Sequence, residues 1–201
     1  MNQPGLFDEY DPPDGYTAPV LHPAEAYAFY ERFILRPVAE KQEFFRRYGF
    51  AWQRTVGSME WEVFAAVLLD DRAAAGGSDL RRTEVKSAHA GGSFEYQYCR
   101  VGGVAKLRHE AKIDHLFVAH RDGCLDVDVR LMRGVRMRNL LAAWEPEVVA
   151  YYAADAKRQR FRKSVTWQYV TDRSDRVLTV RGGDLTYPIL KVPPCARTST
   201  C

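Results

Sequence analysis

The residues best suited to chemistry in this sequence lie between Ser78 and Ser87, where two acids and a lysine occur close together. Glu84 and Lys86 are two positions apart, so in a β-strand their side chains project from the same face. Asp79 supplies a second carboxylate just before them. Carboxylates bind Mg²⁺, and a neighbouring ammonium can orient or deprotonate an attacking water. The segment therefore suits metal-assisted hydrolysis of a phosphodiester, and an ion pair on a solvated strand is the alternative interpretation.

A helix and a strand are expected to position these groups. Ser58 is the expected N-cap of a helix that runs to about Leu69. The helix carries Glu60 and Glu62 near its start, where the helix dipole by itself favours acidic side chains. Residues 79–88 follow as a strand, after a turn-forming Ala-Gly-Gly segment.

Helix and strand patterns alternate along the rest of the chain. An extended, proline-rich arm is expected over residues 1–23, followed by a helix to about Tyr48 that Pro37 should kink or divide. A later helix is expected over residues 135–156, with a break or a new first turn at Pro146. Further strands are expected at 93–100, 113–120, 125–132, 165–169 and 177–179. This order predicts an α/β (α+β) fold with a mixed central β-sheet flanked by helices.

Composition restricts the class of protein. The chain has 201 residues, of which 46% are hydrophobic and 27% charged, which is typical of a globular domain with a sizeable core. The net charge of +3 does not by itself indicate nucleic acid. No apolar run approaches the length of a membrane helix and no signal peptide is visible, so we expect a cytoplasmic protein without membrane contact. The cysteines lack CxxC spacing, which favours free thiols over a zinc site: Cys99, Cys124, Cys195 and Cys201.

The motif Glu84-Val85-Lys86, with Asp79 upstream and an acid-bearing helix before it, resembles the PD-(D/E)xK nuclease superfamily, and within it the type II restriction endonucleases. The resemblance covers about residues 57–156. It implies a restriction-endonuclease-like core within a nuclease domain over residues 57–201, which would end in a C-terminal β extension. Residues 1–56 would form an N-terminal helical arm for dimerisation or DNA contact.

The resemblance also implies roles for individual groups. Asp79, Glu84 and the main-chain carbonyl of Val85 would bind Mg²⁺, for which Mn²⁺ would substitute. Lys86 would position or activate the attacking water, and Glu62 would be the additional catalytic acid on the preceding helix.

Two alternatives remain open among these acids. Asp79 lies only five residues before Glu84, whereas a longer turn is usual in the family, so Asp71 is the alternative to Asp79. Glu60 is likewise the alternative to Glu62.

Basic and polar residues after the motif are candidates for contact with double-stranded DNA, together with the segment 135–138. A solvated basic helix end is the alternative for the later ones. The candidates are Arg81, Arg82, Gln97, Lys106, Arg158, Arg160, Arg162 and Lys163.

We therefore expect a Mg²⁺-dependent endodeoxyribonuclease that cleaves duplex DNA at a specific site as a homodimer, with one active site for each strand. One rival is a modification-dependent or repair endonuclease, in which Trp52, Trp167 and Tyr169 could stack on an extruded base. The other is a non-catalytic binding module. A metal site shared by His115 and His120 is not expected, because their odd separation puts them on opposite faces of a strand.

Overall fold

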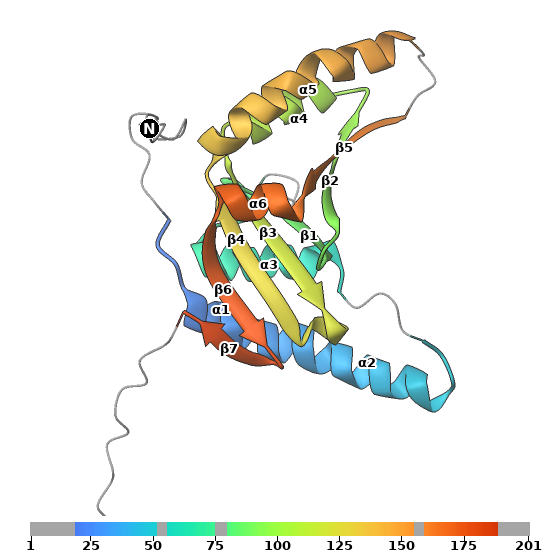
Figure 1. The fold of residues 1–201 in the computed structure, drawn as a ribbon, viewed down its shortest axis with the longest axis vertical. Coiled ribbons are helices and arrows are strands. Elements are labelled where there is room, and N and C mark those ends of the chain that lie inside the picture. The colour runs from blue at the N-terminus through green and yellow to red at the C-terminus, as the bar shows by residue number, and fades with distance from the viewer. Residues whose placement is uncertain (1–18, 52–55, 75–79, 155–158, 189–201) are drawn as a thin grey trace, which may run out of the picture.

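A mixed five-stranded β-sheet forms the centre of the computed structural model, which describes residues 19–51, 56–74, 80–154 and 159–188 (Figure 1). The strands are β1 (Thr83–His89), β2 (Ser93–Cys99), β3 (Asp114–Arg121), β4 (Asp126–Met132), β5 (Arg160–Thr166), β6 (Asp175–Arg181) and β7 (Asp184–Tyr187). The large sheet has the order β1-β3-β4-β6-β7. Only the β1–β3 pair is parallel among these neighbours, and β2 pairs separately with β5 in a two-stranded antiparallel sheet.

Helices cover both faces of this sheet, which confirms the predicted mixed sheet flanked by helices (Figure 1). They are α1 (Pro23–Tyr30), α2 (Arg36–Arg47), α3 (Ser58–Leu69), α4 (Gly103–Glu110), α5 (Gly134–Ala154) and α6 (Trp167–Arg173), with the short turns η1 (Glu31–Leu35) and η2 (Asp122–Cys124). Among the described residues, no helix is both long enough and apolar enough to cross a membrane.

The interior strand β3 separates two hydrophobic cores, because its side chains alternate between the faces of the sheet. Leu116 and Val118 belong to the core that α1 and α3 cover. Phe117 and Ala119 belong to the core that β2, β5 and α5 cover. Apolar residues on both faces of one strand indicate that β3 lies in the interior, whereas β1 is left at the edge of the sheet.

The expected helix before residue 48 is present, but Pro37 does not divide it. The helix runs without interruption through α1, η1 and α2. The turn η1, which ends two residues before Pro37, is π-helical, and Pro37 lies in the first turn of α2. This wider turn accommodates a residue that has no main-chain N–H to donate. As a result, α2 projects beyond the sheet (Figure 1).

One helix was not expected, and three predictions about the elements are wrong. The unexpected helix is α4. Residues 167–169 lie in α6 instead of a strand. That helix begins there because Thr166 caps it, accepting a hydrogen bond from the main-chain N–H of Tyr169 at 3.2 Å. Gly57, not Ser58, is the N-cap of α3. The helix α5 continues through Pro146, which is tolerated because Pro146 is exposed and water can replace the missing hydrogen bond.

Gly134 provides a test of how closely α5 approaches β3. Its N–H donates to Oδ1 of Asp114 at 3.0 Å, and a methyl group added to Gly134 would overlap the main-chain carbonyl of Ile113. We expect Gly134→Ala to lower the free energy of unfolding by about 1–3 kcal/mol in urea denaturation, because main chain must move to relieve the overlap. Ala143→Ser, at an exposed position of α5, should change it by less than about 0.5 kcal/mol. An equally small effect of Gly134→Ala would contradict the close approach.

Candidate active site

The strand β1 places Glu84 and Lys86 on one face, as alternation predicts. The Nζ atom of Lys86 lies 2.5 Å from Oε1 of Glu84. Their side chains are only 17% and 8% exposed, so the pair is sheltered and differs from an ion pair on a solvated strand. Val85 points the other way and packs against the core beneath α3. The sequence pattern therefore predicted the relative placement of these three residues correctly.

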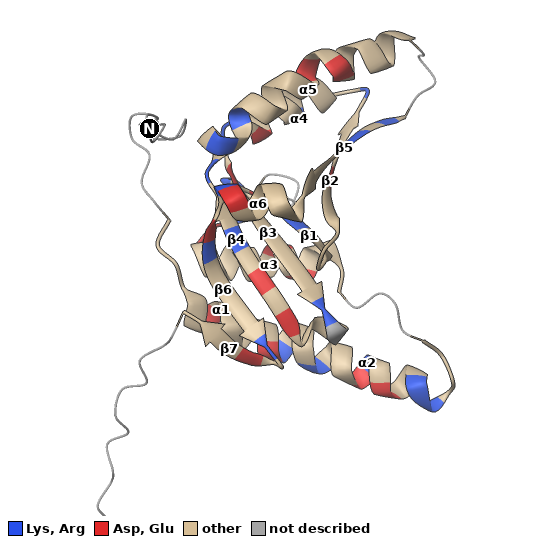
Figure 2. Ribbon diagram, in the orientation of Figure 1, with Lys and Arg blue, Asp and Glu red and all other residues tan. Residues whose placement is uncertain are grey.

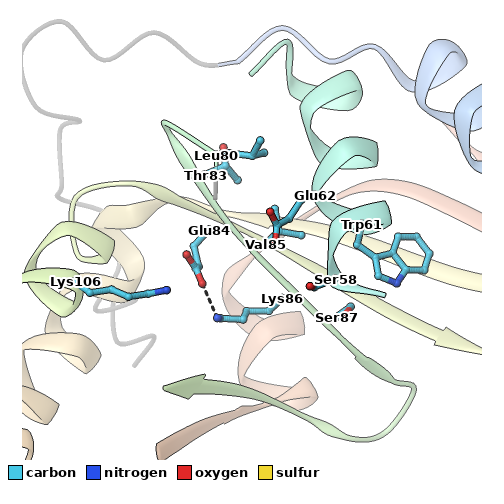
Figure 3. Close-up of a pocket in the computed structure, with 10 residues that line it drawn as sticks. All are labelled: Ser58, Trp61, Glu62, Leu80, Thr83, Glu84, Val85, Lys86, Ser87 and Lys106. Atoms are coloured by element: carbon cyan, nitrogen blue, oxygen red, sulfur yellow. Dashed lines mark ion pairs between the residues drawn. The ribbon is translucent and has the colours of Figure 1, made fainter. Parts of the chain in front are cut away.

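A pocket of about 240 Å³ opens over this edge of the sheet (Figure 3). Its wall combines β1 with the start of α3 and with one lysine of α4. The lining residues are Ser58, Trp61, Glu62, Leu80, Thr83, Glu84, Val85, Lys86, Ser87 and Lys106. Figure 3 shows Lys106 extending from α4 toward the Glu84–Lys86 pair and Glu62 pointing from α3 toward Val85. The pocket thus contains two carboxylates and two ammonium groups.

The oxygen atoms of this pocket fit a hard divalent cation. Glu84 and Glu62 both line it, and so does Val85, whose carbonyl was expected to be a ligand. Among the described residues, no three His, Cys, Asp or Glu side chains are grouped to hold a metal. Mg²⁺ commonly takes one or two protein carboxylates and fills its other positions with water and substrate phosphate, so two carboxylates are sufficient. Asp79, the expected further ligand, lies outside the described residues.

Asp71, the alternative to Asp79, serves the main chain in this structure. Its carboxylate accepts hydrogen bonds from the N–H groups of Arg72 at 2.8 Å and Arg82 at 3.0 Å. It also pairs with the Arg82 guanidinium at 3.5 Å and is nearly fully buried. These contacts connect the end of α3 to the residue before β1. Asp71 does not line the pocket of Glu84.

A layer of buried polar groups lies behind Lys86. The Lys86 ammonium is 4.7 Å from the centre of the Tyr96 ring, which is a cation–π contact. The hydroxyl of Tyr96 is 2.8 Å from Nδ1 of His115, and Nε2 of His115 is 3.0 Å from the carbonyl oxygen of Glu110. A carbonyl can only accept, so Nε2 carries a proton. Burial lowers the pKa of this imidazole, so Nδ1 carries no proton and accepts from the Tyr96 hydroxyl. The imidazole is therefore neutral and held in one tautomer.

The side chain of Glu110 belongs to the same layer. The hydroxyl of Tyr98 donates to its Oε2 at 2.6 Å. Its Oε1 is buried, makes no hydrogen bond within the described part of the chain, and lies 3.6 Å from Nζ of Lys106. Burial is the main cause that raises the pKa of the Glu110 carboxyl above its usual value, and the negative charge of Glu84 is the second.

Sequence reasoning did not find Glu110, Tyr98 or Tyr96, and it read His115 only as a strand histidine. Glu110 ends a helix of eight residues that was not predicted, and its distance from Glu84 along the chain gave no pattern to search for. The tyrosines alternate with more exposed residues along β2, a pattern that indicates only a buried strand face. Their hydroxyl groups meet polar partners only because β2 folds back over β1.

Several of the expected DNA-binding cations have partners within the protein. Arg81 donates to the carbonyl of Ala73 at 3.2 Å, and Arg82 donates to that of Asp70 at 2.9 Å. In the segment 135–138, Arg136 donates to the carbonyl of Arg173 at 2.8 Å. These contacts stabilise loops, so a role in DNA binding would be additional to a structural one.

The later basic residues lie on a strand, so their reading as a helix end is wrong. Arg160 and Arg162 project from the exposed face of β5, where Arg160 bonds Gln97 at 2.9 Å and Arg162 pairs with Glu95 at 3.4 Å. Lys163 lies on the other face and pairs with Glu147 at 2.6 Å. Positive and negative residues are interspersed over these elements (Figure 2). Arg158 lies outside the described residues.

The aromatic residues considered for base stacking contact protein groups. Trp167 packs against Phe94 and beneath the Arg130 guanidinium, and Tyr169 contacts Arg173. Trp52 lies outside the described residues. His120 stacks on Trp61, on the opposite side of β3 from His115, in agreement with their odd separation.

No protein-family model matches this chain, and no curated protein is similar to it in sequence.

The substitution Asp71→Ala tests whether Asp71 has a structural role and not a catalytic one. We expect it to lower the free energy of unfolding by about 1–3 kcal/mol, because two partly buried N–H groups lose their acceptor. Asp70→Asn, at the exposed neighbour whose positive φ suits asparagine, should change stability by less than about 0.5 kcal/mol. Urea denaturation measures both. A variant of Asp71 that is fully stable would contradict the structural role.

His115 should make the folded protein sensitive to acid. Burial, together with the charge of Lys86, lowers its pKa from 6.5 to about 3. Between these two values the unfolded chain binds a proton at this imidazole and the folded chain does not. The stability that the neutral imidazole allows is therefore complete above pH 6.5 and is lost as the pH falls toward 3.

We expect the free energy of unfolding to decline by up to about 1.4 kcal/mol per pH unit through this group below pH 6. In His115→Gln the free energy of unfolding should fall less steeply with decreasing pH, because the proton taken up by this imidazole on unfolding is absent. The control His109→Gln, at an exposed position, should keep the wild-type slope. Glu110 is present in every variant, so its opposite contribution cancels in the comparison. Equal slopes for wild type and His115→Gln would show that the imidazole is protonated in the folded protein.

Proposed function

We propose that this chain is a cytoplasmic, Mg²⁺-dependent endonuclease that hydrolyses phosphodiester bonds of double-stranded DNA, most similar in kind to a type II restriction enzyme. One observation carries the proposal: the sheltered Glu84–Lys86 pair lines a polar pocket together with Glu62 and Lys106. Acids and amines in that arrangement can hold both a divalent cation and the phosphate that it neutralises.

The residues of the pocket have separate tasks in this proposal. Glu84 and Glu62 supply the protein oxygens for Mg²⁺, with Asp79 as the expected third. When bound, the ion supplies charge neutralisation at the phosphate and lowers the pKa of its water. Lys86 directs its ammonium toward the water or a phosphate oxygen. The Tyr96 ring, fixed by His115, limits the movement of Lys86.

A homodimer is part of the proposal, because cutting both strands of a duplex requires two such pockets. Exposed aromatic side chains on and after the projecting helix α2 support it: Phe44 is 57% exposed, Tyr48 63% and Phe50 66%. Large apolar side chains in contact with water are typical of surfaces that bind another protein.

Lys86→Ala tests the chemistry directly. We expect it to reduce Mg²⁺-dependent cleavage of plasmid DNA by roughly 10²–10⁴-fold, because the water loses the group that orients it. Affinity for duplex DNA should change little. The matched control is Lys112→Ala, which removes an exposed lysine outside the pocket and should cut at the wild-type rate.

Cleavage assays with different DNA substrates and different added metals distinguish between the competing functions. Digestion of methylated and unmethylated plasmid, followed by sequencing of the ends, distinguishes a restriction enzyme from a modification-dependent one. Full cutting by Lys86→Ala would refute the assigned role of the lysine. Binding of DNA by the wild type without cleavage in Mg²⁺ or Mn²⁺ would favour a non-catalytic module.

A further inference from the structure

The helix α4 pairs a lysine of the pocket with a deeply buried acid. Lys106 and Glu110 are one helical turn apart, so their side chains lie on the same side of α4. The Lys106 side chain is 39% exposed, whereas that of Glu110 is only 1% exposed. The Lys106 side chain lines the pocket (Figure 3). Oε1 of Glu110 lies 3.6 Å from its ammonium nitrogen.

Glu110 is held firmly at its position. Tyr98 donates to Oε2 of its carboxyl, and His115 donates to its main-chain carbonyl. The start of α4 is also close to β2, since a Cβ atom on Gly103 would lie 3.1 Å from that of Tyr98. A carboxyl fixed in this way can restrain the Lys106 side chain. The acid does not move, so the flexible lysine takes the rotamers that bring its ammonium close to the carboxyl.

The second carboxyl oxygen is the unexpected feature. Burying an acid costs free energy unless both of its oxygens find donors. Oε1 of Glu110 has no hydrogen bond within the described part of the chain, and Nζ of Lys106, at 3.6 Å, is within ion-pair distance but too far for a hydrogen bond. The Lys106 ammonium is within ion-pair distance of this oxygen, so its charge offsets part of the cost of burying an oxygen that has no hydrogen bond.

Lys106 in turn extends toward the Glu84–Lys86 pair (Figure 3). An ammonium group has three donors, so Lys106 can bind an oxygen of a ligand in addition to its contacts within the protein. Lys86 is already paired with Glu84 at 2.5 Å. A phosphodiester entering the pocket would thus meet Lys106 as a second cation, at a position set by α4.

We infer that Glu110 is a positioning residue that holds the Lys106 ammonium where it binds a non-bridging oxygen of the phosphodiester. The inference deepens the proposed function and rests on it for the identity of the substrate. Glu110 itself does not touch the substrate. Its effect on DNA must therefore pass through Lys106, and this is what distinguishes it from a buried acid that only stabilises the fold.

A double-mutant cycle tests this dependence. Lys106→Gln, Glu110→Gln and the double variant are compared in a Lys86→Ala background, so that a short duplex of arbitrary sequence is bound without being cut. Lys106→Gln should weaken binding roughly 5–10-fold and reduce the slope of log affinity against log salt by about one contact. Glu110→Gln should weaken binding by about 3-fold, and the double variant should match Lys106→Gln alone.

Other results would overturn the inference. Independent, multiplicative effects of the two substitutions would show that Glu110 does not act through Lys106. Tighter binding by Glu110→Gln would show that the acid merely repels the phosphate. Lys112→Gln, the matched control at an exposed position two residues after α4, should leave the cycle unchanged. Circular dichroism verifies folding, and Glu110→Asp, which keeps the charge but withdraws it from Lys106, replaces Glu110→Gln if that variant does not fold.

The proposed function can fail separately. A wild type that binds duplex and shows the coupled cycle, but does not cut in Mg²⁺, would keep the inference and refute the nuclease. If the wild type cuts DNA, but the effects of Lys106→Gln and Glu110→Gln on binding multiply, the proposed nuclease function stands and the inference about Glu110 is refuted. A wild type that does not bind duplex at low salt would refute both.

Discussion

The parallel pairing of β1 with β3 is the constraint on which the candidate site depends. Parallel neighbours cannot be joined by a tight turn, so the chain between them must cross over the sheet. This crossover contains β2 and α4, and it covers the face from which Glu84 and Lys86 project. The pocket therefore has one wall from α3 and another from α4, and Lys106 reaches it only because of the crossover.

The buried polar layer is a second consequence of this arrangement. On the side of the sheet away from α3, hydrogen bonds connect Tyr96 with His115, Tyr98 with Glu110, and His115 with the carbonyl of Glu110, behind the Lys86 side of the pocket. Each of these groups would cost free energy if it were buried alone, and hydrogen bonds among them offset most of that cost. Such a network holds its members in one arrangement, which is the property that a site for orienting water or phosphate requires.

The acids near Glu84 show how distance along the chain can mislead. Asp71 precedes Glu84 closely, yet its oxygens bind the main chain of the loop that leads into β1. Glu110 is farther along the chain, yet the charge of Glu84 contributes to the raised pKa of Glu110, because α4 returns over the strand. Spacing identifies residues of one strand or one helix, but it does not identify those that a crossover brings together.

The sequence by itself determined the mixed sheet with its flanking helices and the shared face of Glu84 and Lys86, because both follow from the period of apolar residues in strands and helices. Pro37 and Pro146 were misleading, since a π-helical turn and an exposed position remove their cost. Only the tertiary structure decided that the Glu84–Lys86 pair is sheltered, that Glu110 lies behind Lys106, and that the alternating residues 165–169 end a strand and begin a helix. These features depend on contacts between distant elements, and local periodicity contains no information about such contacts.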